Sequence, residues 1–231
     1  MNGILYGVGV GPGDPELMTL KSVRLIRENR YIAVPGQDPV KSVAYQIAVQ
    51  TVPELKDKIL IAVYMPMTHD PEELKRNHEK GAAVLEKVLR QGNNIVYLTL
   101  GDPTIYSTFS YLQEIVEKDG FQTVPVSGIT SFCAAAARTG TVLTEGNETL
   151  HVIPAGQHPN CGLDGPGNYV LMKSGSRMSS VKEEIRKTGK EVTMVENCGM
   201  PDERIYRDTE AIPDDAGYYS LIILKESRKN D

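Results

Sequence analysis

The sequence has few cysteines, no long apolar run and no excess of positive charge. Its 231 residues include three cysteines, Cys133, Cys161 and Cys198, which form no CxxC pair. A disulfide-stabilised secreted fold is therefore excluded, and we expect a reduced, cytoplasmic protein. No apolar run reaches the roughly 18 residues that a membrane-spanning helix needs. Because residues 1–6 lack a basic start and a cleavage site, we expect no signal peptide and no membrane partner.

Acidic residues outnumber basic ones, 30 against 25, and the net charge is −5. A broad basic surface for wrapping nucleic acid is therefore not expected. Hydrophobic residues make up 40% of the chain and charged residues 24%. This is ordinary globular usage, and it excludes a disordered, fibrous or coiled-coil protein. A chain of this length forms one large domain or two compact ones.

Motifs for a bound metal and for a catalytic nucleophile are also missing. The histidines form no HxH or HExxH pattern; they are His69, His78, His151 and His158. His158, Cys161 and Asp164 share one loop, which we interpret as a polar surface loop rather than a metal site. No GxSxG is present, so no nucleophile elbow is expected.

Short apolar runs alternate with helical patterns along the first part of the chain. Continuous hydrophobicity predicts strands that are buried on both faces. Strand–helix alternation predicts a mostly parallel sheet. The predicted strands are residues 4–10, 31–35, 59–63, 95–100 and 122–126, and an Ala-rich helix through residues 131–137 follows the last one.

Four Asp-Pro pairs precede segments with a helical pattern. Aspartate can cap a helix, and proline suits the first helical position because its missing N–H would lack a partner there. The pairs are Asp14-Pro15, Asp38-Pro39, Asp70-Pro71 and Asp102-Pro103. The third resembles a capping box that includes Glu73. The apolar stripe from Leu74 to Leu89 then predicts a helix, which Gly92 ends.

The pattern changes after the Ala-rich helix. Residues 139–147 are rich in glycine and threonine and predict a linker, so we divide the chain into domains 1–140 and 141–231. The second domain is rich in predicted strands, at residues 150–154, 169–173, 192–196 and 218–224, and has one clearly predicted helix at 178–187. We predict a second α/β domain with a mixed sheet that is richer in antiparallel pairing.

Glycine-rich loops follow two predicted strands of the first domain. The loop at residues 7–15 matches neither GxGxxG nor a P-loop, but such loops let a ligand approach the backbone, with a simple tight turn as the alternative. Gly101-Asp102-Pro103 follows another strand, and a helix cap is the alternative for Asp102. Parallel sheets bind ligands beyond the carboxyl ends of their strands, so both loops could flank one crevice.

Two further segments could contribute hydrogen bonds or contacts to a ligand. Thr130 and Ser131 open the Ala-rich helix, where they could instead be caps. Met172 and Lys173 end a predicted strand of the second domain, and core packing is the alternative for Met172.

Taken together, these segments resemble the tetrapyrrole methylases, which transfer methyl groups from S-adenosylmethionine to porphyrinoid carbons. The resemblance runs from Leu5 to about Leu224, and residues 9–17 and Gly101-Asp102-Pro103 are characteristic of the family. More specific segments resemble the branch that methylates C20 of precorrin-2 or cobalt-factor II on the way to cobalamin (vitamin B12). They are residues 66–68, 98–109, 130–135 and 200–205.

The resemblance implies a homodimer of two-domain subunits that hold the methyl donor in the cleft between the domains. Carried over residue by residue, cofactor contacts fall on Pro12, Leu100, Gly101, Asp102, Ile105, Thr130, Ser131, Met172 and Cys198. The segment around Cys198 more often carries glycine in the family. Uroporphyrinogen-methylating relatives have an acidic residue after the second strand; this chain has Pro35 there, so that role is not transferred.

The resemblance also implies a chemistry without a protein-bound metal. Methyl transfer from a sulfonium is an in-line displacement, so the protein must align the reactants and exclude water. C20 then loses a proton, for which Tyr106 is our candidate acceptor, with packing as the alternative. Candidates for binding the substrate carboxylates are Lys173, Arg177 and Arg204.

We expect a cobalt-bearing ring to be preferred over a metal-free one. A planar, rigid ring loses less conformational freedom when it is docked for in-line attack. His69 could approach an axial position of the cobalt, but an exposed loop histidine is the favoured interpretation.

Two alternatives stay open. A diphthine synthase or an rRNA ribose methylase shares this fold and cofactor but acts on a macromolecule, and an rRNA partner would require a basic face. A catalytically silent corrinoid-binding protein is the other alternative. Turnover that depends on S-adenosylmethionine distinguishes that case.

Overall fold

The computed structural model describes residues 1–66, 68, 70–157 and 162–227, and it consists of two compact units, Met1–Thr130 and Ser131–Asp231. The division therefore lies earlier in the chain than the boundary expected after residue 140. The reason is that helix α5 (Ser131–Thr139) packs against strand β10 (Ser220–Lys225) of the second unit.

The first unit contains a parallel sheet with the strand order β3-β2-β4-β1-β5. All of its strand pairings are parallel, which confirms the predicted sheet. The strands are β1 (Ile4–Gly9), β2 (Tyr31–Pro35), β3 (Ile59–Val63), β4 (Ile95–Thr99) and β5 (Gln122–Val126). Strands β1 and β4 each end one residue before the predicted end.

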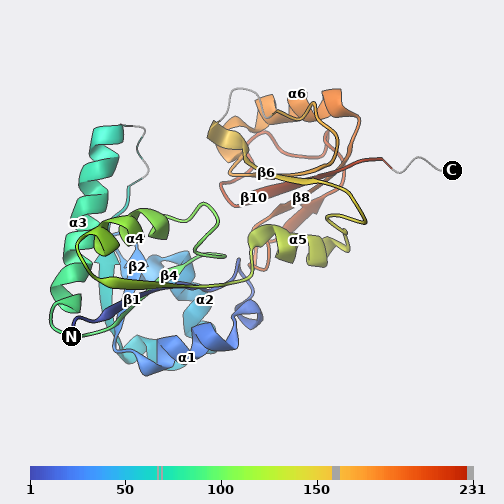
Figure 1. Cartoon of the computed structure of the whole chain (residues 1–231). Coiled ribbons are helices and arrows are strands. Elements are labelled where there is room, and N and C mark those ends of the chain that lie inside the picture. The colour runs from blue at the N-terminus through green and yellow to red at the C-terminus, as the bar shows by residue number, and fades with distance from the viewer. Residues whose placement is uncertain (67, 69, 158–161, 228–231) are drawn as a thin grey trace. The chain divides into compact units, whose positions relative to one another are not determined.

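Helices cover both faces of this sheet, and the central strand shows why its apolar run is continuous. On one face, Val96 and Leu98 join a core with α1 (Leu20–Glu28) and α2 (Val43–Thr51). On the other face, Ile95 and Tyr97 pack with α3 (Pro71–Leu89) and α4 (Phe109–Lys118). Figure 1 shows the two helix pairs on opposite sides of the strands. Successive side chains of β4 thus point alternately into the two hydrophobic cores.

The prediction that each Asp-Pro pair precedes a helix is only partly right, because three of the four pairs begin a short turn instead. Asp14 and Asp38 each cap a single 3-10 turn. Helix α1 begins later, where the hydroxyl of Thr19 accepts from the N–H of Ser22 at 3.1 Å. Asp102 likewise precedes a turn, and α4 begins further along the chain.

Asp70 caps α3 as predicted, but the reciprocal half of the capping box is not formed. Its carboxylate accepts from the N–H groups of Glu72 and Glu73 at 2.9 and 3.3 Å. The carboxylate of Glu73 instead accepts from the hydroxyl of Thr68 at 2.9 Å. That same hydroxyl accepts from the N–H of Asp70 at 3.2 Å, so Thr68 takes the place that the glutamate was expected to fill.

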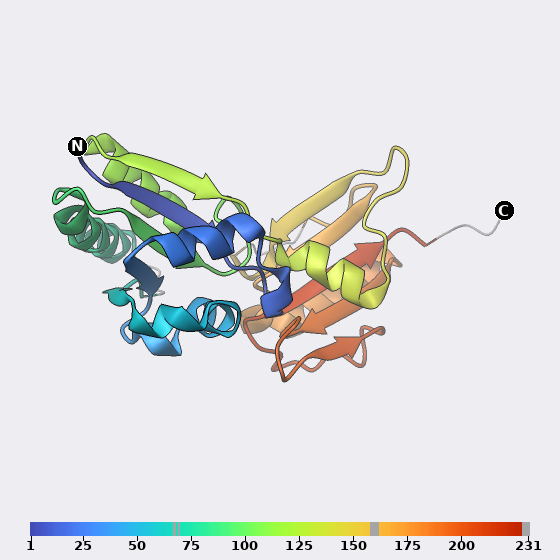
Figure 2. The ribbon, with the colours of Figure 1, turned by 90° about the horizontal axis from the view of Figure 1, so that it is seen from below.

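The second unit contains a mixed sheet, as predicted, and its strand order is β6-β7-β10-β8-β9. Strands β6 (Leu150–Pro154) and β7 (Asn168–Met172) are parallel, and β10 runs antiparallel to β7 and to β8 (Glu191–Glu196). Helices α5 and α6 (Met178–Thr188) cover opposite faces (Figures 1 and 2). Strand β9 (Arg204–Tyr206) was not predicted, because its short, exposed sequence has no apolar run.

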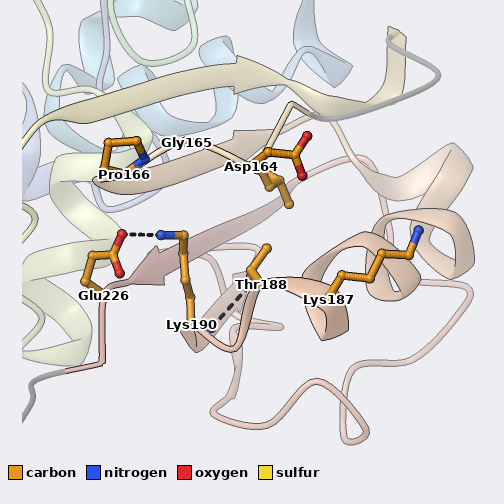
Figure 3. Close-up of a pocket in the computed structure, with 8 residues that line it drawn as sticks. Asp164, Gly165, Pro166, Lys187, Thr188, Lys190 and Glu226 are labelled. Carbon is orange, nitrogen blue, oxygen red and sulfur yellow. Dashed lines mark hydrogen bonds and ion pairs between the residues drawn. The ribbon is translucent and has the colours of Figure 1, made fainter.

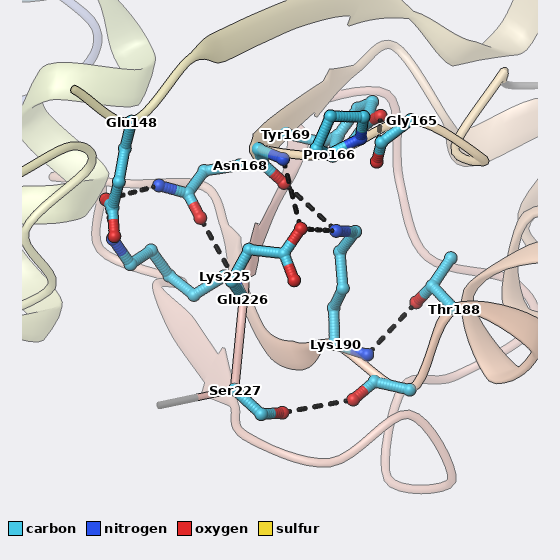
Figure 4. Close-up of polar contacts among 12 residues, drawn as sticks. Glu148, Gly165, Pro166, Asn168, Tyr169, Thr188, Lys190, Lys225, Glu226 and Ser227 are labelled. Atoms are coloured by element: carbon cyan, nitrogen blue, oxygen red, sulfur yellow. Dashed lines mark hydrogen bonds and ion pairs between the residues drawn. The ribbon is translucent and has the colours of Figure 1, made fainter. Parts of the chain in front are cut away.

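A buried amide joins three segments of the second unit (Figure 4). Asn168 is fully buried, and its Nδ2 donates to the carbonyl of Leu143 and to Oε2 of Glu148, both at 2.8 Å. Its Oδ1 accepts from the N–H of Glu226 at 3.0 Å. The expected linker is therefore bound to the sheet. Hydrogen bonds from Lys225, the backbone and this amide lower the pKa of Glu148 to about 2.

Along the described residues, no helix is both long enough and apolar enough to cross a membrane.

Candidate functional site

Backbone hydrogen bonds join two loops at the carboxyl edge of the first sheet. Just beyond the paired strands, Gly11 in the loop after β1 and Gly101 in the loop after β4 form an isolated antiparallel bridge. The N–H of Val10 donates to the carbonyl of Thr99 at 3.0 Å, and the N–H of Gly101 donates to the carbonyl of Gly11 at 2.8 Å. The two glycine-containing loops are therefore neighbours, as their position after adjacent parallel strands predicts.

Asp102 attaches a third loop to these two. One carboxylate oxygen accepts from the N–H and the hydroxyl of Thr104, at 2.8 and 2.6 Å. The other accepts from the N–H of Gly128, after β5, at 3.0 Å. The side chain is 8% exposed. Its carboxylate thus holds the loops together, and because Asp102 begins a turn rather than a helix, the alternative of a helix cap is wrong.

Glycine is required where the three loops meet. A Cβ built on Gly9 would lie 2.4 Å from the carbonyl oxygen of Gly101, and one built on Gly128 would lie 2.1 Å from the same atom. Gly101 itself has a φ of 71°, and a Cβ there would have no protein atom nearer than 3.9 Å. A side chain at Gly101 would therefore meet no clash from the described chain, and what favours glycine there is its left-handed φ. A backbone without a side chain also lets a ligand approach closely.

The predicted cofactor residues fall into two groups, one in each unit. The three joined loops of the first unit carry Pro12, Leu100, Gly101, Asp102, Ile105 and Thr130. In the second unit, Ser131 begins α5, Met172 ends β7 and Cys198 follows β8. Strands β7 and β8 both run antiparallel to β10, so their carboxyl ends share one edge of the sheet. Met172 is half-buried at that edge, and Cys198 is buried.

Backbone strain is concentrated beside these residues. Within the described part of the chain, the non-glycine residues with a left-handed backbone are Tyr106, Lys173 and Asn197, with φ values of 48°, 59° and 53°. Each is the immediate neighbour in sequence of a predicted cofactor residue. Such conformations cost about 1–3 kcal/mol and gather at active sites and ligand clamps. They are an indication of these sites that is independent of the motifs.

Two buried hydroxyls lack a hydrogen-bond partner among the described residues, Thr130 Oγ1 and Ser174 Oγ. The capping alternative for Thr130 is therefore wrong. A buried polar atom without a partner is costly and is usually satisfied by water or by a ligand. Thr130 lies in the loop that the carboxylate of Asp102 binds through Gly128, so a backbone without a side chain at Gly101 and an unsatisfied hydroxyl occur in one group of loops. Both features fit a bound ligand at the predicted position.

Tyrosines occur at both candidate edges. Tyr106 is 45% exposed, so it does not belong to the buried core. Tyr218 and Tyr219 precede β10, with ring centroids 5.3 Å apart, and the N–H of Asn197 donates to the carbonyl of Tyr219 at 3.1 Å. Burial raises the pKa of both hydroxyls. The strand predicted at residues 218–224 includes this pair, although two successive tyrosines before an apolar run could have indicated a site.

A separate hollow of about 420 Å³ lies in the second unit (Figure 3). Its lining residues precede β7 and β8 or follow β10, so it lies at the sheet edge opposite Met172 and Cys198. Lys190 donates to Glu226 and, at 3.0 Å, to the carbonyl of Gly167. Its polar groups therefore bind one another, and the hollow is not the predicted site.

Several expectations fall on residues outside the described ranges. They concern the axial role of His69, part of the segment at residues 66–68, and the polar loop with His158 and Cys161. In the remainder of the chain, no group of three or more His, Cys, Asp or Glu side chains is placed to hold a metal ion.

A family model for tetrapyrrole (corrin/porphyrin) methylases matches residues 4–213. This chain belongs to the tetrapyrrole methylase family. A probable cobalt-precorrin-2 C(20)-methyltransferase of Methanocaldococcus jannaschii is 31% identical over 97% of each chain. The cobalt-precorrin-2 C(20)-methyltransferase of Salmonella typhimurium is 28% identical over 98% of each chain. The precorrin-2 C(20)-methyltransferase of a Sinorhizobium species is 24% identical over 96% of this methylase and 95% of the relative.

Solved structures share the fold of this methylase at lower identity. A cobalamin synthesis related protein of Corynebacterium diphtheriae has a TM-score of 0.76 and 18% identity, over 98% of this chain and 99% of that one. A uroporphyrin-III C-methyltransferase of Thermus thermophilus, complexed with S-adenosyl homocysteine, has a TM-score of 0.68 and 22% identity, over 97% of this chain and 98% of that one. The predicted two-domain α/β fold is confirmed.

Proposed function

We propose that this methylase transfers a methyl group from S-adenosylmethionine to C20 of a precorrin-2-type tetrapyrrole and prefers the cobalt-bearing ring. The supporting observation is the similarity to C(20)-methyltransferases over almost the whole chain. The two relatives named for a cobalt substrate are 31% and 28% identical, and the one named for precorrin-2 is 24% identical. None of these relatives is named for a macromolecular substrate or for a silent binding role.

The loops of the first unit fit the methyl donor that the family implies. We propose that the backbone of Gly101, which carries no side chain, contacts the donor and that the unsatisfied hydroxyl of Thr130 hydrogen-bonds to it. Pro12, Leu100, Asp102, Ile105, Ser131, Met172 and Cys198 complete the proposed set. When bound, S-adenosylmethionine supplies a methyl group that its sulfonium activates. The chain holds the reacting carbon in line and keeps water away.

Tyr106 remains the proposed acceptor of the C20 proton. Its hydroxyl-bearing side chain is half-exposed, and its left-handed backbone directly follows Ile105. Replacing Tyr106 with phenylalanine should lower kcat while the affinity for S-adenosylhomocysteine is retained. Tyr218→Phe and Tyr219→Phe are the matched comparisons, because these two residues are about as exposed as Tyr106 and lie at the other candidate edge. A Tyr106→Phe enzyme with the wild-type kcat excludes this role.

The substrate is tested directly. Cobalt-factor II and metal-free precorrin-2 are offered separately with S-adenosylmethionine under anaerobic conditions, and NMR locates the new methyl group. We expect methylation at C20 and a higher kcat/KM for the cobalt-bearing ring. A tenfold preference for the metal-free ring, about 1.4 kcal/mol in transition-state stabilisation, would contradict the cobalt preference. The absence of any methylated product would contradict the function.

A homodimer in the cytoplasm is part of the same proposal, supported by the family and by the low cysteine content. Sedimentation at tens of micromolar should show a species of twice the chain mass of 25.4 kDa. A monomer at that concentration contradicts it.

A further inference from the structure

Lys173 holds a backbone conformation that lysine rarely adopts. Its φ of 59° lies in the left-handed region, where the Cβ of an L residue crowds the following carbonyl. The cost is about 1–2 kcal/mol, and glycine would avoid it. Asn197 has a similar φ, but its short amide side chain can bond locally in this conformation. The lysine side chain is therefore the feature at Lys173 that needs an explanation.

The position of Lys173 places it at the predicted site. Met172, the last residue of β7, pairs with Pro154 of β6 on one side and with Leu221 of β10 on the other. Lys173 thus leaves the sheet between two strands at its carboxyl edge, beside a predicted cofactor residue. Cys198 follows β8 at the same edge. The strained lysine is a central feature of this edge rather than part of a peripheral loop.

The charge of Lys173 is partly removed from water. The residue is half-buried, and burial lowers the pKa of its ammonium group. Partial desolvation weakens the screening of nearby charges, so an anion that docks beside this ammonium gains more than it would beside an exposed lysine. The same anion would favour the charged form and reverse the effect of burial.

The other two candidate cations fit this role less well. Arg204 is exposed, and its guanidinium pKa is raised by a hydrogen bond with Tyr206 and by the nearby carboxylates of Glu196 and Asp202. That local negative charge opposes a further carboxylate. Arg177 precedes α6 with a φ of −136°, a conformation without left-handed strain. Lys173 alone combines strain, partial burial and a place beside Met172.

We propose that Lys173 binds a carboxylate of the tetrapyrrole substrate and thereby orients the ring at the edge that carries Met172. This inference rests on the proposed function, because it requires a substrate with acidic side chains. The ammonium contributes a charge-assisted hydrogen bond, and no covalent bond changes at Lys173. Removal of this ammonium group should therefore weaken tetrapyrrole binding and raise KM, with a smaller effect on kcat.

The test is an equilibrium titration of cobalt-factor II into protein saturated with S-adenosylhomocysteine, followed by absorbance. Lys173→Met and Lys173→Gly should raise the tetrapyrrole Kd roughly ten- to hundredfold, the usual effect of losing a hydrogen bond to a charged group. Lys173→Arg should stay within a few-fold of wild type. The matched control is Lys187→Met, which removes an exposed lysine at the opposite edge of the same sheet and should leave the Kd unchanged.

Calorimetry with S-adenosylhomocysteine should give the same affinity for all four variants. Lys173→Gly should melt at or above the wild-type temperature, because glycine adopts this φ without strain. A folded Lys173→Gly protein with the wild-type tetrapyrrole Kd overturns the proposal. If wild type binds the ring but does not methylate it, the proposed function fails, and the titration still decides the role of Lys173.

Discussion

Gly101 and Asp102 are adjacent, yet they contribute to the candidate site in different ways. Gly101 supplies a left-handed turn and a stretch of backbone without a side chain. Asp102 supplies a carboxylate that accepts three hydrogen bonds from Thr104 and Gly128. One residue therefore leaves the backbone free of a side chain, and the other holds the loops in place.

Gly101→Ala and Gly101→Val should remain folded and lose affinity for S-adenosylhomocysteine. The strain of a left-handed φ should lower stability by about 1–2 kcal/mol, and the new side chain would occupy the place beside the loop where we propose that the donor binds. The valine variant should bind no ligand. Calorimetry in excess chelator measures the affinity, and binding that needs an added metal ion would contradict the proposed site. The control is Gly120→Ala, since Gly120 has a φ of 87° with no atom near its Cβ position. An unchanged affinity in folded Gly101→Ala counts against the assignment.

Asp102→Asn should destabilise the first unit. The amide has one acceptor oxygen where the carboxylate has two, so either Gly128 or Thr104 loses its partner in a buried place. The expected loss is about 1–3 kcal/mol, measured by denaturant unfolding. Asp38→Asn is the control, because Asp38 caps an exposed turn. If Asp102→Asn and Asp38→Asn lower the free energy of unfolding by equal, small amounts, Asp102 is only a local cap.

At the scale of elements, a buried acid lies where α3 packs against α4. Glu86 of α3 is buried and forms an ion pair with Arg90 at 2.6 Å. Burial, together with Asp119 beyond the end of α4, raises the pKa of Glu86 above its ordinary 4.5, and the pairing with Arg90 only partly offsets this. The folded protein therefore binds this proton more tightly than the unfolded chain does.

Glu86→Gln should make the protein more stable at neutral pH and less dependent on pH. A raised pKa in the folded state means that this stabilising contribution is complete below pH 4.5 and is lost as the pH rises through the folded-state pKa. At neutral pH the wild-type side chain is ionised and this stabilising contribution is lost, whereas glutamine stays neutral. Urea unfolding between pH 4 and pH 8 measures this difference. Glu79→Gln, on an exposed position of the same helix, is the control. A less stable Glu86→Gln protein at pH 7 would mean that the bond to Arg90 outweighs burial.

At the scale of the whole molecule, each unit has its own core and its own polar connections. In the second unit the connection is Asn168, which ties the segment before β6 and the end of β10 to the start of β7. Because these hydrogen bonds join residues far apart in sequence, their loss should affect the whole unit rather than one loop.

Asn168→Ala should lower the stability of the second unit by about 2–4 kcal/mol. The change leaves the carbonyl of Leu143 and the N–H of Glu226 without partners in a partly buried place, and each such loss costs about 1–3 kcal/mol. Calorimetric unfolding should show this as a shift of the transition that belongs to the second unit. The control is Asn147→Ala at an exposed position of the preceding turn. A loss as small as that of Asn147→Ala would show that the three segments are held by packing alone.

The sequence by itself determined the strands of the first unit, the mixed character of the second sheet and the family. A buried strand such as β4 is recognised from its own residues, because an apolar run must leave water wherever it lies in the chain. The loop motifs likewise predicted positions that the structure places at strand ends. Short, exposed β9 lacked that local signal.

Only the tertiary structure decided which partners those residues have. Helix α5 belongs to the second unit because it packs on β10, which lies far away in sequence. The carboxylate of Asp102 bonds to Gly128, and the unsatisfied hydroxyl of Thr130 and the strained backbone of Lys173 become visible only in three dimensions. These features depend on distances and dihedral angles that are set when segments far apart in sequence pack together. The order of residue types along the chain does not show which segments those are.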